Sequence, residues 1–135
     1  MPMRRGFAAY QLPAIVWAAL IFVASSIPGT EYPEINIAGI DKVVHFAIYA
    51  ILCLLTYNAV KHQDLFPRLA RRAMSVSMLL TTLYGLTDEL HQLAVPGRSC
   101  DVWDLAADIL GCLLCLLIVW GRDRFVSRSE TAGGS

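Results

Sequence analysis

The chain has 135 residues, of which 56% are hydrophobic and 16% charged, whereas a soluble domain usually carries roughly a quarter of charged residues. Eleven basic and eleven acidic side chains give a formal net charge of zero, so the overall charge does not indicate nucleic acid as a partner. Four segments nearly free of charge, residues 7–27, 43–60, 73–95 and 102–121, take up most of the chain. A soluble helical domain is disfavoured, because four consecutive helices that are apolar all round leave no polar face for water.

Each of the four segments predicts a helix that crosses a membrane. A spanning helix needs about 20 mostly apolar residues, because hydrocarbon offers the backbone amides no partner outside the segment. We therefore expect an all-α integral membrane four-helix bundle, built from one domain over residues 1–126. The Ser- and Gly-rich tail, residues 127–135, is expected to be disordered.

The first segment also fits a second interpretation. Arg4 and Arg5 precede it and small residues at 24–26 end it, as in a cleavable secretory signal peptide. The apolar run is longer than the usual core of such a peptide, and its removal would leave three helices. We therefore expect the first helix to be retained.

The charged residues predict the orientation in the membrane. Nine of the eleven basic residues flank the segments on one side: Arg4, Arg5, Lys61, Arg68, Arg71, Arg72, Arg122, Arg124 and Arg128. By the positive-inside rule both termini are cytoplasmic, and the connections at residues 28–42 and 96–101 face outward. Eight of the eleven acids gather on that outer side: Glu31, Glu34, Asp41, Asp88, Glu89, Asp101, Asp104 and Asp108.

The third segment carries a polar stripe near its outer end. At about 100° per residue, one sector of this helix holds Thr81, Tyr84, Gly85, Asp88 and Gln92, with Glu89 at its edge. His91 points away from the stripe, and we place it at the outer membrane interface. A charge inside a bilayer is costly unless it faces the bundle interior and finds a partner, so the stripe predicts an inward-facing polar face.

The second and fourth segments add polar faces at a similar depth. Asp41, His45 and Tyr49 follow at i, i+4 and i+8 on the second. One side of the fourth carries both acids and small residues: Asp101, Asp104, Asp108, Gly111, Cys112 and Cys115. Small residues allow close helix packing in lipid, so we expect this side to pack against the second or third helix.

Structural interpretations compete with a functional one. Asp41 and Asp101 could act as N-caps, while Lys42 and Arg98 could neutralise nearby carboxylates. For Glu89, Asp104 and Asp108 we favour a functional site, since three acids at hydrocarbon depth are costly unless they are used. The pair Cys112 and Cys115 is interpreted as packing residues, and we expect no disulfide.

The chain resembles the VanZ-like membrane family at these same positions. The motifs occur in the family's order: Asp41-Lys42-x-x-His45-Phe46-x-x-Tyr49, Tyr84-Gly85-x-x-x-Glu89-x-x-Gln92, Pro96-Gly97-Arg98, and Asp104-x-x-x-Asp108-x-x-Gly111. The family pattern more often has Asn at the position of Asp108. The resemblance implies a small multi-pass envelope protein of the bacterial cytoplasmic (inner) membrane, in a family named for a member that raises tolerance to the glycopeptide teicoplanin.

The side chains allow two main hypotheses about function. In the first, Lys42, His45 and Arg98 bind an anionic lipid headgroup or a lipid-linked cell-wall precursor, which Glu89, Gln92 and Asp104 orient. In the second, the protein is a membrane-embedded hydrolase or transferase with the candidate catalytic residues His45 or Glu89 as general base. Whether the protein is an enzyme is left open, and an ion-coupled carrier ranks last.

We assign no cofactor and no resident metal ligand. A metal-assisted variant of the second hypothesis uses His45, Glu89, Asp104 and Asp108 to bind Mg²⁺, Mn²⁺ or Ca²⁺ rather than a structural Zn²⁺. The expected partners are membrane lipids and, by the first hypothesis, a lipid-linked cell-wall precursor, with the oligomeric state left open. The full set of candidate binding residues is Asp41, Lys42, His45, Tyr49, Tyr84, Glu89, Gln92, Arg98, Asp104 and Asp108.

Overall fold

A computed structural model of the protein describes residues 6–32 and 38–132. Within these ranges the regular structure is entirely helical. The elements are the π-helix η1 (Phe7–Gln11), α2 (Leu12–Ser25), the 3₁₀ turn η2 (Gly29–Glu31), α3 (Ile40–Lys61), α4 (Pro67–Ala70), α5 (Ala73–Gln92) and α6 (Val102–Ala132). The predicted all-helical fold is confirmed, with each of the four predicted segments forming a long helix.

Three helices are long and apolar enough to cross a membrane: Phe7–Ser25, Ile40–Lys61 and Val102–Ser129. The helix α5 has 20 residues, which is the length a span needs. It is not among these three helices, because the predicted polar stripe runs along it. The pattern of exposure on α5 shows how it fits a membrane bundle.

The helix α5 is polar inside and apolar outside. Its buried side carries Ser77, Thr81, Gly85, Asp88, Glu89 and Gln92, whereas its exposed side carries Leu79, Leu80, Leu83, Leu86 and Leu90. In water this arrangement would be unfavourable, because large apolar patches are normally buried and acids are normally solvated. In lipid it is the favourable one, which identifies the chain as a membrane protein.

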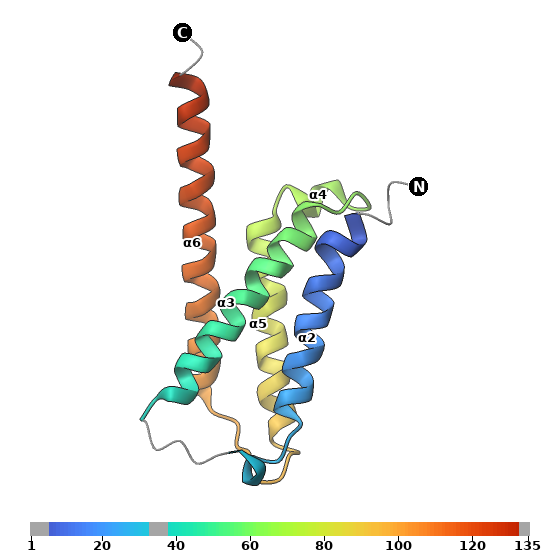
Figure 1. The fold of residues 1–135 in the computed structure, drawn as a ribbon, viewed down its shortest axis with the longest axis vertical. Helices are drawn as coiled ribbons and strands as arrows, with labels where there is room; N and C mark the ends of the chain where they lie inside the picture. Colours follow the sequence, from blue (N-terminus) through green and yellow to red (C-terminus); the bar gives the residue numbers. More distant parts are fainter. Residues whose placement is uncertain (1–5, 33–37, 133–135) are drawn as a thin grey trace.

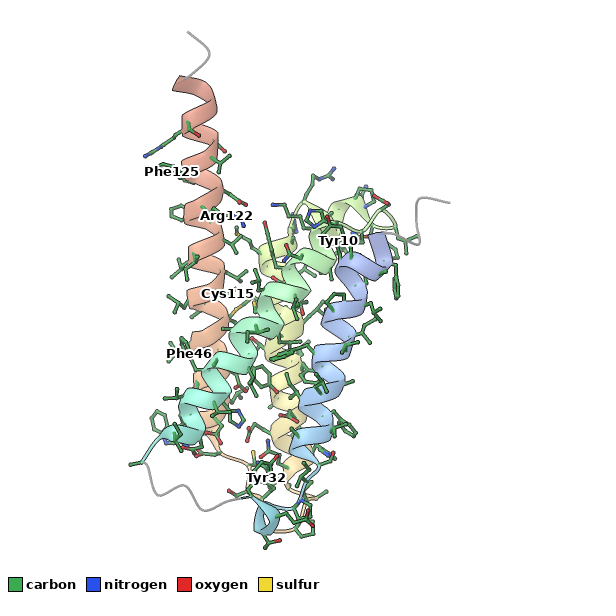
Figure 2. All side chains as sticks on the ribbon, viewed as in Figure 1. Tyr10, Tyr32, Phe46, Cys115, Arg122 and Phe125 are labelled. Carbon is green, nitrogen blue, oxygen red and sulfur yellow. The ribbon has the colours of Figure 1, made fainter. Side chains whose placement is uncertain are left out.

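Helix α3 lies at the centre of the bundle. It packs against α2, α5 and most extensively against α6, and Figure 1 shows α6 crossing it and extending beyond the other helices. The first helix begins and the last helix ends on the same side of the bundle. We call the opposite side, where α2 and α5 end and α3 and α6 begin, the polar end; Tyr32 lies there in Figure 2, far from Tyr10.

Small residues bring α6 close to α3, as predicted. A Cβ added to Gly111 would overlap the carbonyl group of Phe46, and the Cys112 thiol donates to the Tyr49 carbonyl at 3.7 Å. Cys112 is completely buried in a cluster with Tyr49, Leu52 and Cys53. All four cysteines are free.

The two connections at the polar end contact each other. The Gly29 amide donates to the Pro96 carbonyl at 2.9 Å, and a side chain at Gly29 would overlap the backbone of Gly97. Gly97 itself has φ 71°, which favours glycine. Residues 33–37 of the first connection lie outside the described residues.

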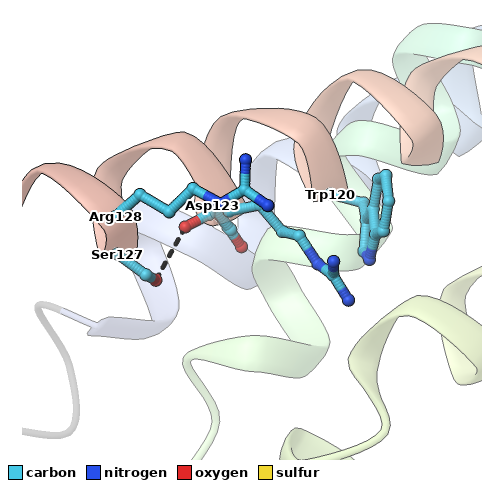
Figure 3. A pocket seen from close by; sticks show the side chains of 5 residues that line it. Trp120, Asp123, Ser127 and Arg128 are labelled. Atoms are coloured by element: carbon cyan, nitrogen blue, oxygen red, sulfur yellow. Dashed lines mark hydrogen bonds between the residues drawn. The ribbon is translucent and has the colours of Figure 1, made fainter.

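Residues 127–132, which the sequence assigns to a disordered tail, continue α6 in the structure. Two side-chain hydroxyls bond back to the helix backbone here: Ser127 Oγ donates to the Asp123 carbonyl at 2.8 Å and Ser129 Oγ to the Val126 carbonyl at 2.7 Å. Figure 3 shows Ser127 hydrogen-bonded to Asp123, with Trp120 farther along the helix. The Trp120 ring lies 4.6 Å from the Arg124 guanidinium. No Gly or Pro interrupts the chain between Gly121 and Gly133. Residues 133–135 lie outside the described part.

Candidate functional site

Lys42, in the first turn of α3, binds three carboxylates at the polar end. Its Nζ lies 2.7 Å from Asp41 Oδ2, 2.8 Å from Asp101 Oδ2 and 3.0 Å from Asp104 Oδ1. The hydrogen bond from Lys42 lowers the pKa of Asp101, because it stabilises the carboxylate. An ammonium has three N–H donors, and here all three meet carboxylates. Lys42 therefore matches the interpretation as a neutralising residue and has no donor left for an anionic headgroup.

The two predicted N-caps have different outcomes. Asp101 Oδ1 accepts a hydrogen bond from the Trp103 amide at 2.8 Å, so Asp101 does stabilise the start of α6. The N-cap of α3 is instead Gly39, which has φ 78° and makes no side-chain cap. The N-cap interpretation is therefore wrong for Asp41, whose carboxylate accepts from Lys42.

His45 contacts the three acids that the sequence singles out. Its Nδ1 lies 3.1 Å from Asp108 Oδ1 and 3.9 Å from Glu89 Oε1, while its Nε2 lies 3.8 Å from Asp104 Oδ2. Glu89 is 1% exposed and Asp108 is completely buried. The helices α3, α5 and α6 thus bring one imidazole and three carboxylates together inside the bundle.

Two oxygens of this cluster lack a hydrogen-bond partner among the described residues. They are Glu89 Oε1 and Asp108 Oδ2. The other oxygen of Glu89 accepts from the Asp101 amide at 2.9 Å. A buried acceptor without a partner is costly, so the arrangement is suited to a proton, a cation or a polar ligand group.

Gly85 makes room for the carboxylate of Asp108. A Cβ at position 85 would lie 2.9 Å from Asp108 Oδ2 and 3.2 Å from the ring of Tyr49. Any larger residue would therefore push the carboxylate or the ring out of place. The glycine in the polar stripe has a local steric role that only the packed structure reveals.

The two candidate tyrosines differ in position. Tyr49 is fully buried and donates to Asp88 Oδ2 at 3.0 Å, while its ring lies parallel to that of His45 with centroids 6.1 Å apart. Tyr84 donates to the Ala18 carbonyl at 2.6 Å and so connects α5 to α2. Of the two, Tyr49 lies beside the histidine of the carboxylate cluster.

A cavity of about 450 Å³ opens beside the cluster, between α2, α3 and α5. Its apolar walls contain Ile21, Ala24, Ile40, Val44 and Ile48, and its polar lining contains Ser25, Tyr32, Asp41, His45, Asp88, Gln92 and Arg98. The sequence placed Asp88 in the polar stripe but not among the candidate binding residues. Because Asp88 lines the cavity, we add it to the candidate binding residues. Its place in the polar stripe was the sequence feature that could have identified it.

Arg98 is held by backbone carbonyls and an aromatic ring. Its Nε donates to the Ile27 carbonyl at 3.3 Å and one terminal nitrogen to the Ala24 carbonyl at 3.2 Å. The guanidinium also lies 4.4 Å from the centre of the Tyr32 ring. None of the ion pairs among the described residues involves Arg98, so the neutralising interpretation does not hold for it.

His91 lies off the polar stripe, as expected, and packs against α2 near the polar end. Its Nε2 lies 3.0 Å from Ser26 Oγ, and its ring stacks on Phe22 with centroids 4.8 Å apart. The helical-wheel argument separated His91 correctly from the polar stripe, but it did not include α2, which covers this side of α5.

These observations define a helical membrane protein with a carboxylate and histidine site inside the bundle. The chain belongs to the VanZ/LLP1 family, whose sequence profile matches residues 10–125, so the predicted resemblance is confirmed.

The chain is also similar to a protein of the fission yeast Schizosaccharomyces pombe, the uncharacterized protein C11E3.10. The two are 32% identical over 87 residues, which cover 64% of this chain and 50% of the yeast protein. The chain thus matches about half the length of this curated relative. No solved structure matches the chain significantly.

Proposed function

We propose that the protein binds the phosphate-bearing headgroup of a membrane lipid in the cavity between α2, α3 and α5. The proposal rests on the contacts that Arg98 makes. Arg98 is the one Lys or Arg among the described residues that line the cavity. Its contacts are to carbonyls and a ring rather than to carboxylates. A guanidinium has five N–H donors in a planar fork suited to phosphate, so Arg98 keeps donors for a ligand.

The rest of the lining supports a headgroup that also carries hydrogen-bond donors. Asp88 Oδ1 is buried without a partner among the described residues, and Gln92 lines the same cavity. These groups suit the hydroxyl or amine groups of a headgroup, while the apolar walls suit the start of its acyl chains. The same chemistry occurs in a lipid-linked cell-wall precursor. The similarity to a fission yeast protein favours an ordinary membrane lipid, because yeasts do not make peptidoglycan.

The proposal includes an orientation. The protein crosses the bacterial inner membrane four times with both termini cytoplasmic, and the cavity opens to the outer leaflet. The position of the first and last helix ends on one side of the bundle supports an even number of spans. The basic residues of the connection before α5 and of the last turns of α6 lie on that side.

Native mass spectrometry of the gently extracted protein tests headgroup binding. We expect wild type to retain lipid from nanodiscs of phosphatidylethanolamine and phosphatidylglycerol. The lipid affinity of Arg98→Ala should be about tenfold lower, which corresponds to about 1.4 kcal/mol of binding free energy. The control is Arg68→Ala, which changes an exposed arginine at the other end. Equal retention by wild type and Arg98→Ala overturns the proposal. Retention only from nanodiscs doped with a lipid-linked precursor assigns the ligand to that source.

A link to glycopeptide tolerance follows from the same proposal, because a protein that binds outer-leaflet lipids can change the envelope surface. Expression in a teicoplanin-sensitive bacterium should raise the inhibitory concentration for wild type more than for Arg98→Ala. An identical concentration for both variants would separate tolerance from headgroup binding.

A hydrolase or transferase is the second candidate function. The observation that favours it is the hydrogen bond of 3.1 Å between His45 Nδ1 and Asp108 Oδ1, which orients an imidazole at the cavity wall as a general base. Incubation of lipid nanodiscs with wild type and His45→Gln, followed by mass spectrometry of the lipids, tests this candidate. We expect product with wild type and none with His45→Gln; equal turnover by both would remove His45 as a catalytic residue.

A further inference from the structure

His45, Glu89 and Asp108 offer three ligand atoms from three different helices. One atom of each residue lies within 4.8 Å of one atom of each of the others. Residues this far apart in the chain meet only because α5 and α6 pack on the same part of α3. The distances are near those at which three side chains can surround one ion after small adjustments.

The oxygens without a partner point to what is bound here. Glu89 Oε1, which faces His45 Nδ1 at 3.9 Å, has no hydrogen bond among the described residues, and neither has Asp108 Oδ2. Both side chains are at least nine-tenths buried. Two adjacent carboxylates with unpaired oxygens in a bundle interior are costly unless a positive charge completes the site.

The nearest lysine does not supply that charge. Lys42 contacts Asp41, Asp101 and Asp104, and no ion pair joins it to Glu89 or Asp108 within the described part of the chain. With His45 neutral, the two carboxylates carry two negative charges, which one divalent cation balances.

From this geometry we infer that His45 Nδ1, Glu89 and Asp108 bind one divalent cation. This inference does not depend on headgroup binding. The two carboxylates favour a hard ion and the imidazole tolerates a first-row transition metal, so Mn²⁺ matches the set best. Three protein ligands leave coordination positions for water or a phosphate oxygen, and His45 also lines the cavity.

Asp104 is a positioning residue rather than a ligand. Its Oδ2 lies 3.8 Å from His45 Nε2, on the opposite side of the ring from Nδ1, and its Oδ1 accepts from Lys42. A carboxylate at the second nitrogen of a ligating histidine fixes the ring orientation. Asp104, which the metal-assisted hypothesis included as a ligand, is therefore left out of the ligand set. It pairs with Lys42 instead.

Electron paramagnetic resonance of Mn²⁺ titrated into the metal-stripped, full-length protein in nanodiscs tests the site. We expect one Mn²⁺ per chain, with about hundredfold weaker binding in Glu89→Gln and in Asp108→Asn, and about tenfold weaker binding in Asp104→Asn. The matched control is Asp123→Asn, which removes an acid near the other end of α6. A nitrogen coupling in the spectrum, lost in His45→Gln, would identify the imidazole ligand.

A second group of three acids allows a result that would contradict the inference. Asp41, Asp101 and Asp104 also lie close enough to hold an ion, but Lys42 already occupies their centre. We therefore expect Asp101→Asn to keep Mn²⁺ binding unchanged. Loss of binding in Asp101→Asn with binding retained in Asp108→Asn, or no binding by correctly folded wild type, would overturn the inference.

Discussion

The Tyr49 hydroxyl donates a buried hydrogen bond of 3.0 Å to Asp88 Oδ2, joining the centre of α3 to α5. The same tyrosine ring lies nearly parallel to the His45 ring, with an interplanar angle of 4°. One side chain therefore donates to one oxygen of an acid in the cavity wall and packs beside the histidine of the carboxylate cluster.

Replacing Tyr49 by Phe is expected to destabilise the bundle. The change leaves Asp88 with no partner on either oxygen, and a buried acceptor without a partner costs about 1–3 kcal/mol. Denaturant titration of the purified protein in detergent measures the free energy of unfolding. The double variant Tyr49→Phe with Asp88→Leu should recover part of the loss, because it removes the unpaired acid. An unchanged unfolding midpoint in Tyr49→Phe would contradict the buried bond.

Replacing Gly85 by Ala is expected to disturb both stability and the site. The added methyl meets Asp108 Oδ2 and the Tyr49 ring, and overpacking of this kind costs about 1–3 kcal/mol. The matched control is Gly121→Ala in α6, where an added Cβ has no atom within 4 Å. Helix propensity should leave this control unchanged or stabilise it by up to about 1 kcal/mol. Equal thermal stability of the two variants would rule out the close approach at Gly85.

The interaction between Asp101 and Lys42 predicts a pH dependence of stability. The pKa of Asp101 is lowered below its usual 3.8 by Lys42, so its contribution is fully present above about pH 4 and is lost as the pH falls through the lowered folded value. The neighbouring charged groups are Asp41 and Asp104, which share Lys42.

Thermal unfolding of wild type and Asp101→Asn between pH 7 and pH 2 checks this sign. The difference between the two melting temperatures should stay constant from pH 7 to about pH 5 and shrink at lower pH. A difference that grows on acidification would contradict the assignment.

Cys100 reports the orientation in the membrane. It is the one exposed cysteine of the four and lies just before α6 at the polar end. In intact bacterial spheroplasts, a membrane-impermeant maleimide should label wild type and not Cys100→Ser. Labelling only after the membrane is opened would reverse the proposed orientation.

Much of the fold follows from local patterns. Helix existence depends on apolar length, and the inward side of each helix depends on a period of about 3.6 residues, so the stripe with Thr81, Asp88 and Gln92 and the small face with Gly111 are both visible in the sequence. The same reasoning grouped His45, Glu89 and Asp108, because all three lie near the predicted outer ends of their segments. Composition predicted a disordered tail from residue 127, whereas the structure continues α6 to residue 132.

The sequence by itself determined which residues face inward and at what depth, because hydrophobicity and helical period act within one segment. Only the tertiary structure decided the partners. Lys42 binds Asp101 and Asp104, which follow it by 59 and 62 residues, and Arg98 instead binds carbonyls at the end of α2. Which partner a side chain finds depends on how far the packed helices are shifted along one another. The close contacts at Gly85 and Gly111 determine that shift.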